Sequence, residues 1–503
     1  MKKILFSIAL LGCNLTLLAQ EITPANAMQY AMDNLTGTAR YRAMSGAFGA
    51  LGGDLSALNS NPAGSAVFRF NQASGTLSSI NTRNSSSYFG TRTIENEYAL
   101  DLNQAGVVFV FANQNPDSDW KKFSLAINYE NNSNFENQIF TRGVNPSQSI
   151  DRYFLRFANG LPNEGGIFLD VLNNAFFEDL NFIDQQALLG YNAYIFNPVE
   201  NVPDNSLYVS NVPTLGNYYQ ENFTSINGYN GKLTGNFATS YQDKLYLGIN
   251  LNAHFTDATT VSSIYERYNA SQGLQSVQFD NETYTYGGGF SFALGAIAKI
   301  SESLRLGLTY ESPTWYTLHD EQRQRIRTFC NTCASNNPII YDPNVTMIYD
   351  SYRLQTPGKW SASGAYVFGK RGLISVDYSM KDYSTTTYRP RTDSYLESLN
   401  DYMKTNLTVS NELRIGGEFK HKQWSLRGGY RMEESPYKER KIIGDLQGYT
   451  GGLGYDFGDS RIDLAYAYSS RKMDFNLISS GMTDTSRLTT INNNISVTYS
   501  INF

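Results

Sequence analysis

The chain has 503 residues, a formal net charge of −6 and a charged fraction of 17%, below the roughly 25% of an ordinary soluble domain. Its 36 Tyr, 29 Phe and 41 Gly residues exclude a disordered chain, because disordered chains are poor in aromatic side chains. The slightly acidic balance offers no basic face, so we predict no nucleic-acid partner.

The first 20 residues have the layout of a secretory signal peptide. Two lysines precede an apolar run over residues 4–11, and cleavage is predicted near Ala19 or Gln20. A lipoprotein cleavage site ending at Cys13 is the alternative, but apolar residues continue beyond that cysteine. After residue 20 there is no run of about 18 apolar residues, so we expect an exported chain without a transmembrane helix.

Short segments in which apolar residues alternate with small or polar ones recur along the chain. They begin near residues 123, 245, 304, 374, 424 and 462, each just after a short turn and each preceded by a strand-like run. Alternation with period two places apolar side chains on one face of a strand. Six such hairpins, with one strand leading in and one leading out, give about 14 strands with tight turns at one end and long polar loops at the other.

An even number of antiparallel strands with short turns on one side is typical of a bacterial outer-membrane β-barrel. The last strand supports this, because Ile495, Val497, Tyr499 and Ile501 alternate with polar residues and the chain ends at Phe503. This strand resembles the C-terminal signal recognised by the barrel-assembly machinery of Gram-negative bacteria. We therefore predict an all-β transmembrane protein in the outer membrane, surrounded by lipid and lipopolysaccharide.

Residues 21–66, which precede the barrel at 67–503, do not have the pattern of a strand. They contain many small residues, a Gly-Gly-Asp-Leu-Ser-Ala step with Asp54, and the triplet Asn61-Pro62-Ala63 just before the first strand. This arrangement resembles the FadL-type family of outer-membrane transporters for hydrophobic compounds. The resemblance covers the layout of the whole mature chain, but sequence-level matching is confined to about residues 40–66.

The resemblance implies that residues 21–66 form a hatch that plugs the barrel. It implies passive uptake of hydrophobic small molecules such as long-chain fatty acids, with a hatch movement that releases the ligand sideways into the membrane. It implies neither a cofactor nor an enzymatic activity. Relatives that serve as outer-membrane components of a protein-secretion system, or that are labelled haemin receptors, provide the alternative functions.

Several charged residues fall on the non-lipid side when the apolar residues are placed outward. A lipid-facing Arg at mid-depth costs roughly 2–4 kcal/mol, which favours the inward register. We expect these inward charged residues either to anchor the hatch through Arg40, Arg42 and Asp54 or to solvate a water-filled lumen. The lumen residues are Arg305, Asp377, Arg414, Glu418, Arg427, Asp456 and Asp463.

The longest predicted loop, residues 134–228, contains apolar residues at roughly helical spacing. A long apolar outer loop needs either a cover or a ligand. The family resemblance favours a groove for the incoming ligand, and mutual packing that closes the barrel mouth is the compatible alternative. The candidate groove residues are Phe154, Phe157, Phe168, Leu172, Phe176 and Phe177.

Cys330 and Cys333 are the cysteines that remain after export. A loop disulfide is favoured over a redox dithiol or half a metal site, because an exported protein meets an oxidising environment. His254, His319 and His421 are the only histidines, and no nucleophile-elbow motif accompanies them. We therefore predict no metal site and no catalytic residues.

Overall fold

The computed structural model describes residues 22–160, 165–214, 216–333 and 337–503. The predicted signal peptide lies outside these residues. Among the described residues, no helix combines the length and apolar character needed to cross a bilayer.

The described chain forms a closed antiparallel β-barrel of 14 strand positions, as the sequence predicted. The first strand pairs with the last, and this seam closes the barrel. In order around the wall the strands are β1 (Gln72–Tyr88), β2 (Thr91–Ala112), β3 (Trp120–Asn134) continued by β4 (Asn137–Asn145), β7 (Tyr218–Tyr241), β8 (Leu245–Arg267), β9 (Leu274–Lys299), β10 (Leu304–Glu311) continued by β11 (Trp315–Cys330), β15 (Lys359–Val367) preceded by β14 (Tyr352–Gln355), β16 (Gly372–Asp382) continued by β17 (Thr387–Arg389), β18 (Val409–His421), β19 (Trp424–Glu433), β20 (Ile443–Asp456), β21 (Ser460–Asn476) and β22 (Thr485–Asn502).

Side chains alternate along these strands as the period of two requires. On β22, Ile495, Val497 and Tyr499 are about half exposed, whereas Ser496 and Thr498 are buried toward the lumen. A wall that is apolar outside and polar inside is the arrangement that a bilayer demands of a barrel.

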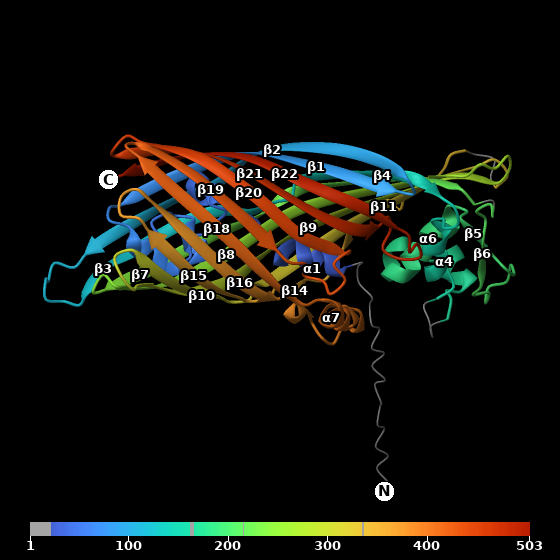
Figure 1. Ribbon diagram of the computed structural model, residues 1–503. Coiled ribbons are helices and arrows are strands. Elements are labelled where there is room, and N and C mark those ends of the chain that lie inside the picture. The colour runs from blue at the N-terminus through green and yellow to red at the C-terminus, as the bar shows by residue number, and fades with distance from the viewer. Residues whose placement is uncertain (1–21, 161–164, 215, 334–336) are drawn as a thin grey trace, which may run out of the picture.

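The six short turns and the C-terminus lie at one end of the barrel, which we call the turn end (Figure 1). The opposite end, the loop end, has most of the remaining elements. These are α4 (Asp151–Ala158), α5 (Leu169–Asn174), η2 (Phe177–Asp179), α6 (Phe182–Asn192), the hairpin of β5 (Phe196–Pro198) and β6 (Tyr208–Ser210), β12 (Ile339–Tyr341), β13 (Met347–Ile348), η3 (Tyr383–Thr385) and α7 (Ser394–Asn406).

The segment between the third and fourth strand positions is shorter than the expected 134–228. β4 and β7 stay paired as far as Asn145 and Tyr218, so the connection covers residues 146–217. The alternation rule missed these outer strand ends, because both faces of the wall are polar where it extends beyond the apolar band. We call residues 146–217 the cap.

Residues 22–67 lie inside the barrel (Figure 1). They form α1 (Pro24–Ala31), α2 (Ala39–Ala43), α3 (Ala57–Ser60) and the 3₁₀ helix η1 (Pro62–Val67). The second helix packs on β19 to β22, while η1 packs on β3, β7, β8 and β9. The segment is thus enclosed by strands from both halves of the wall, and we call it the hatch.

Candidate functional site

A buried chain of charges joins the hatch to the wall. Arg40 Nε on α2 donates to Glu418 Oε2 at 3.0 Å, and Arg427 Nε donates to the same oxygen at 2.6 Å. Arg427 Nη1 also donates to Asp463 Oδ1 at 2.7 Å. Because the side chains of Glu418, Arg427 and Asp463 are fully buried, each charge depends on its partners for compensation.

Two other predicted lumen charges contact the hatch directly. Arg305 Nη1 donates to the backbone oxygen of Leu51 at 3.1 Å. Arg414 Nη1 donates to Tyr41 Oη at 3.2 Å. Four of the seven predicted lumen residues therefore lie within hydrogen-bond reach of the hatch or of a residue that binds it, namely Arg305, Arg414, Glu418 and Arg427.

The other predicted anchors differ in what they contact. Asp54 Oδ1 accepts hydrogen bonds from Thr38 Oγ1 at 2.7 Å and from Ser56 N at 3.0 Å, so it organises the hatch internally. Asp377 on the wall accepts a hydrogen bond from the hatch amide of Gly49 at 2.8 Å. Asp456 is the exposed last residue of β20, where it accepts a hydrogen bond from Gly458 N.

The Asn-Pro-Ala triplet is a folded turn pressed against the wall. Asn61 Oδ1 accepts a hydrogen bond from Ala63 N at 3.0 Å and thereby caps η1. Its Nδ2 donates to Gly49 O in the hatch at 2.8 Å and to Ala296 O on β9 at 3.0 Å. Pro62 occupies the first position of the 3₁₀ helix, where no backbone donor is needed. The side chain of Asn61 thus forms hydrogen bonds with backbone groups of both the hatch and the wall.

Two wall glycines make room for this turn. Gly248 and Gly295 are direct cross-strand partners on β8 and β9. A Cβ at Gly248 would lie 2.4 Å from Pro62 C, and one at Gly295 would lie 2.1 Å from Asn61 Oδ1. The sequence analysis did not identify these two glycines. Glycines at inward-facing positions of neighbouring strands can indicate that another segment packs closely against the wall.

A lumen cavity of about 150 Å³ adjoins the hatch. Apolar side chains of Leu35, Ile80 and Leu446 line it together with the guanidinium of Arg42. Arg42 is 4% exposed, and its Nη1 donates to Ser78 Oγ at 3.1 Å. Its Nε is buried without a hydrogen-bond partner among the described residues, so the cavity presents an unused cationic donor.

The backbone pairing between neighbouring wall strands is interrupted beside this cavity. Pairing between β2 and β3 ends at Gln104 and Glu130, and beyond that point β4 pairs only with β7. The outer strand instead bends over the lumen face of β1, where Ser86 Oγ and Thr141 Oγ1 lie 2.6 Å apart. On the other side of the gap, Leu100 of β2 is 87% exposed. Across this stretch Asn131 Nδ2 still donates to Asp101 Oδ1 at 2.8 Å, and Thr93 Oγ1 donates to the backbone oxygen of Phe140. We call this stretch, where side chains but no backbone pairs join the two strands, the wall gap.

Helix α1 lies across the lumen above the cavity. The ring of Tyr30 packs at 6.0 Å from Phe135 at the β3–β4 break and at 5.3 Å from Tyr316 on β11. After the helix, Asp33 pairs with Lys359 at 2.9 Å and with Lys381 at 3.0 Å. The path from the loop end to the cavity is therefore obstructed by the N-terminal part of the hatch.

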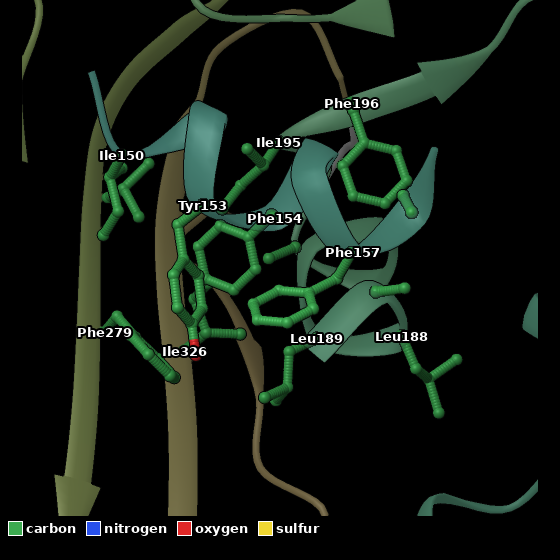
Figure 2. Packing of buried hydrophobic residues seen from close by; sticks show 14 of the residues in the cluster. Ile150, Tyr153, Phe154, Phe157, Leu188, Leu189, Ile195, Phe196, Phe279 and Ile326 are labelled. Carbon is green, nitrogen blue, oxygen red and sulfur yellow. The ribbon is translucent and has the colours of Figure 1, made fainter. Parts of the chain in front are cut away.

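The cap is held by a cluster of apolar side chains. Tyr153, Phe154 and Phe157 of α4 point toward Leu189 of α6 and Phe279 of β9 (Figure 2). Burial in the cap also raises the pKa of the Asp151 carboxyl at the start of α4, despite hydrogen bonds from neighbouring serines.

The structure divides the six predicted groove residues into two groups. Phe168 and Phe176 are 54% and 70% exposed. The other four lie inside the cluster and pack on one another and on the wall, namely Phe154, Phe157, Leu172 and Phe177. Helical spacing identified apolar residues correctly but could not tell which face the rest of the cap would cover.

The remaining predicted groups have structural contacts. A disulfide joins Cys330 and Cys333 at the outer end of β11. Within the described ranges, no group of three or more His, Cys, Asp or Glu side chains could hold a metal ion. His254 Nε2 lies 2.9 Å from Ser291 Oγ, and its Nδ1 lies 3.3 Å from Tyr316 Oη, so neither ring nitrogen contacts a carboxylate.

Comparisons with known proteins agree with this architecture. Residues 217–503 match the family model described as outer membrane protein transport protein (OMPP1/FadL/TodX). No curated protein matches the chain.

Solved structures share the fold at low sequence identity. A FadL homologue from Pseudomonas aeruginosa is 13% identical, with 94% of this chain and 100% of that chain covered and a TM-score of 0.52. The CymD monoaromatic hydrocarbon channel is 11% identical over 94% of this chain and 99% of that one, with a TM-score of 0.50. The TodX monoaromatic hydrocarbon channel lacking S2 and S3 is 15% identical over 93% and 100%, with a TM-score of 0.51.

Proposed function

Because the chain belongs to the OMPP1/FadL/TodX family of outer membrane transport proteins, we propose that it takes up hydrophobic small molecules, such as long-chain fatty acids, without an energy source. Membership makes the chain an outer-membrane β-barrel transport protein rather than an enzyme. The loop end then faces the exterior and the turn end faces the periplasm.

The observation that carries the proposal is the wall gap beside the lumen cavity. Asn103 on β2 and Asn134 on β3 line the cavity close to the point where pairing between these two strands stops. An unpaired strand edge facing lipid is costly, and such an edge is tolerated where it lines a cavity or a passage. A ligand that reaches the cavity can therefore leave sideways without crossing the periplasmic half of the hatch.

The lining of the cavity favours an amphiphile over a pure hydrocarbon. Leu35, Ile80 and Leu446 offer apolar contacts, while Arg42 Nε offers a charge-assisted hydrogen bond to a carboxylate. A buried N–H donor without a hydrogen-bond partner is unfavourable, and an anionic head group would accept its hydrogen bond. In this role Arg42 binds the head group of the ligand, and the wall gap accommodates its hydrocarbon tail.

The cavity is too small for the whole ligand in the observed conformation. Its volume of about 150 Å³ is below the roughly 300–1,000 Å³ of pockets that enclose drug-sized molecules. Helix α1 also obstructs the route from outside. Transport therefore requires the hatch to shift, and the exposed Phe168 and Phe176 of the cap provide the first apolar contact for the ligand.

A reversible cross-link between hatch and wall tests this mechanism. A Cβ at Gly49 would lie 2.9 Å from Ser363 Cβ on β15, so paired cysteines need only about 1 Å of adjustment to reach disulfide geometry. We expect the oxidised Gly49→Cys/Ser363→Cys variant to lose uptake of radiolabelled oleate by intact cells and to regain it on reduction.

Each single-cysteine variant serves as the control, because it cannot lock the hatch. Uptake that is equal in the oxidised and reduced double variant would contradict a moving hatch. The Arg42→Gln variant tests the ligand class in the same assay: we expect oleate uptake to fall while toluene uptake stays unchanged. Equal loss for both compounds would contradict recognition of an anionic head group.

A further inference from the structure

A pair of arginines lies on the outer surface of the barrel just beyond its apolar band. On β10 and β15 the band ends with Tyr310 and Trp360, whose rings lie 4.6 Å apart. Trp315 continues it at the start of β11 and is 43% exposed. Tryptophan and tyrosine at this position mark the boundary between hydrocarbon and head groups.

Arg353 and Arg389 face each other directly above this boundary. Two residues after Trp315, Thr317 pairs with Arg353 on β14, which in turn pairs with Arg389 on β17. Both arginines are exposed, whereas their neighbours Tyr352, Leu354 and Tyr388 are buried, so the two guanidinium groups share the outward face.

This juxtaposition is unfavourable in the protein alone. Like charges directly opposite each other on a sheet destabilise it, because their Cβ atoms lie only about 5 Å apart. Among the residues that the structure describes, neither Arg353 nor Arg389 has an ion pair or a side-chain hydrogen bond. An anion bound between them would remove the repulsion.

Nearby arginines on the same outer surface are arranged differently. Arg325 on β11 pairs with Asp280 at 2.8 Å, and Arg323 pairs with Asp342 at 3.5 Å. These side chains are exposed to a similar degree but have acidic partners within the protein. Arg327, farther out on β11, also has no acidic partner among the described residues, but it lies opposite Ile340 and Gln278 rather than a second arginine. The facing pair of unpartnered arginines therefore occurs in the row of Arg353 and Arg389, which is also closer to the membrane boundary than Arg323, Arg325 and Arg327.

We propose that Arg353 and Arg389 bind a phosphate group of lipopolysaccharide in the outer leaflet. Guanidinium groups donate paired hydrogen bonds to phosphate oxygens, and two of them at this spacing can hold one phosphate from both sides. The position above the tryptophan boundary is the depth at which the phosphates of a glycolipid anchored in the outer leaflet lie. This site is separate from the lumen and does not rest on the proposed transport function.

Binding of lipid A to the full-length protein in detergent tests the proposal by native mass spectrometry. The probes are bis-phosphorylated lipid A and the same lipid after dephosphorylation. We expect the Arg353→Gln/Arg389→Gln variant to bind the phosphorylated lipid about 30-fold more weakly, as expected for two arginines near an anionic surface. Binding of the dephosphorylated lipid should be the same in the variant and the native protein.

The matched control is the Arg323→Gln/Arg325→Gln variant, which removes the same number of positive charges from arginines that already have acidic partners. We expect it to change the affinity for phosphorylated lipid A by less than about twofold, because arginines in exposed surface ion pairs contribute little. Equal weakening in both double variants would overturn the site in favour of net charge. Unchanged affinity in the Arg353/Arg389 variant would also overturn it.

Folding is checked on the same purified variants, and transport is checked in intact cells that express them. Heat-dependent mobility of the barrel in detergent gels verifies that each variant is folded, and oleate uptake reports on the lumen. Loss of lipid A binding with normal uptake is the expected combination. Normal lipid A binding with no uptake would contradict the transport proposal alone.

Discussion

The hatch and the cap close the same barrel with different proportions of polar and apolar contacts. The hatch combines directional contacts to the wall, as at Arg40 and Glu418, with small apolar clusters such as that of Ala63 and Tyr246. The cap relies on a cluster of apolar side chains such as Phe154 and Leu189, which attract without a preferred direction. The polar side chains that bind the hatch can exchange partners within a wet lumen, whereas opening the cap would expose its apolar cluster to water. This difference is compatible with the hatch movement that we propose.

The largest expected effect comes from Glu418→Gln, which removes the carboxylate shared by Arg40 and Arg427. Breaking a buried ion pair from one side costs about 3–5 kcal/mol, because a charge stays buried without compensation. We expect the hatch to detach more often and single-channel conductance in planar bilayers to rise.

The matched control is Glu434→Gln, at a partly exposed carboxylate that lies 3.6 Å from Arg440 and accepts a hydrogen bond from Asn411, for which the glutamine oxygen remains an acceptor. We expect no measurable change in conductance, since surface pairs contribute about 0–1 kcal/mol. The Arg40→Gln/Glu418→Gln variant should be closer to the native protein than Glu418→Gln alone. A conductance that is unaffected by Glu418→Gln would mean that the lumen charges only solvate the interior.

A substitution in the core of the cap should loosen the cap itself and leave conductance through the barrel unchanged. Leu189 is fully buried in the apolar cluster, and Leu189→Ala removes about 2–5 kcal/mol from buried packing. We expect faster limited proteolysis within residues 146–217 and an unchanged single-channel conductance. Phe176→Ala, at a position that is 70% exposed, should leave proteolysis unchanged. A conductance change in Leu189→Ala would show that the two closures are coupled.

The smallest of the three effects should come from steric crowding at the hatch motif. Gly295→Ala places a methyl group against Asn61, and overpacking of this kind costs about 1–3 kcal/mol. We expect a modest rise in conductance from a displaced hatch. Gly75→Ala is the control, because a Cβ there meets no atom within 4 Å. If both variants behave alike, close approach at Gly295 does not hold the hatch in place.

The barrel could be predicted because its signal is local. Alternation along a segment such as 495–503 depends on one strand and one lipid surface, and the inward register of Arg427 follows from the cost of exposing charge to lipid. The hatch was expected from the family resemblance, which rests in part on Asn61-Pro62-Ala63 just before the first strand.

The finer features depend on which distant segments meet. The wall gap arises because β4 bends over β1, and nothing in the sequence of either strand specifies that contact. The same holds for Gly248 and Gly295, whose close approach is to residues that are far away in the chain. Phe154 and Phe176 look alike in the sequence, and only the folded cap separates a buried ring from an exposed one.

The seam between β1 and β22 has a consequence for biogenesis. It joins residues at the two ends of the barrel sequence, so it can form only after the last strand has been synthesised. The hatch precedes β1 and is therefore exported before any wall strand exists to enclose it. Its small residues, asparagines and arginines suit this order, because they let the segment remain in water until the wall has been assembled around it.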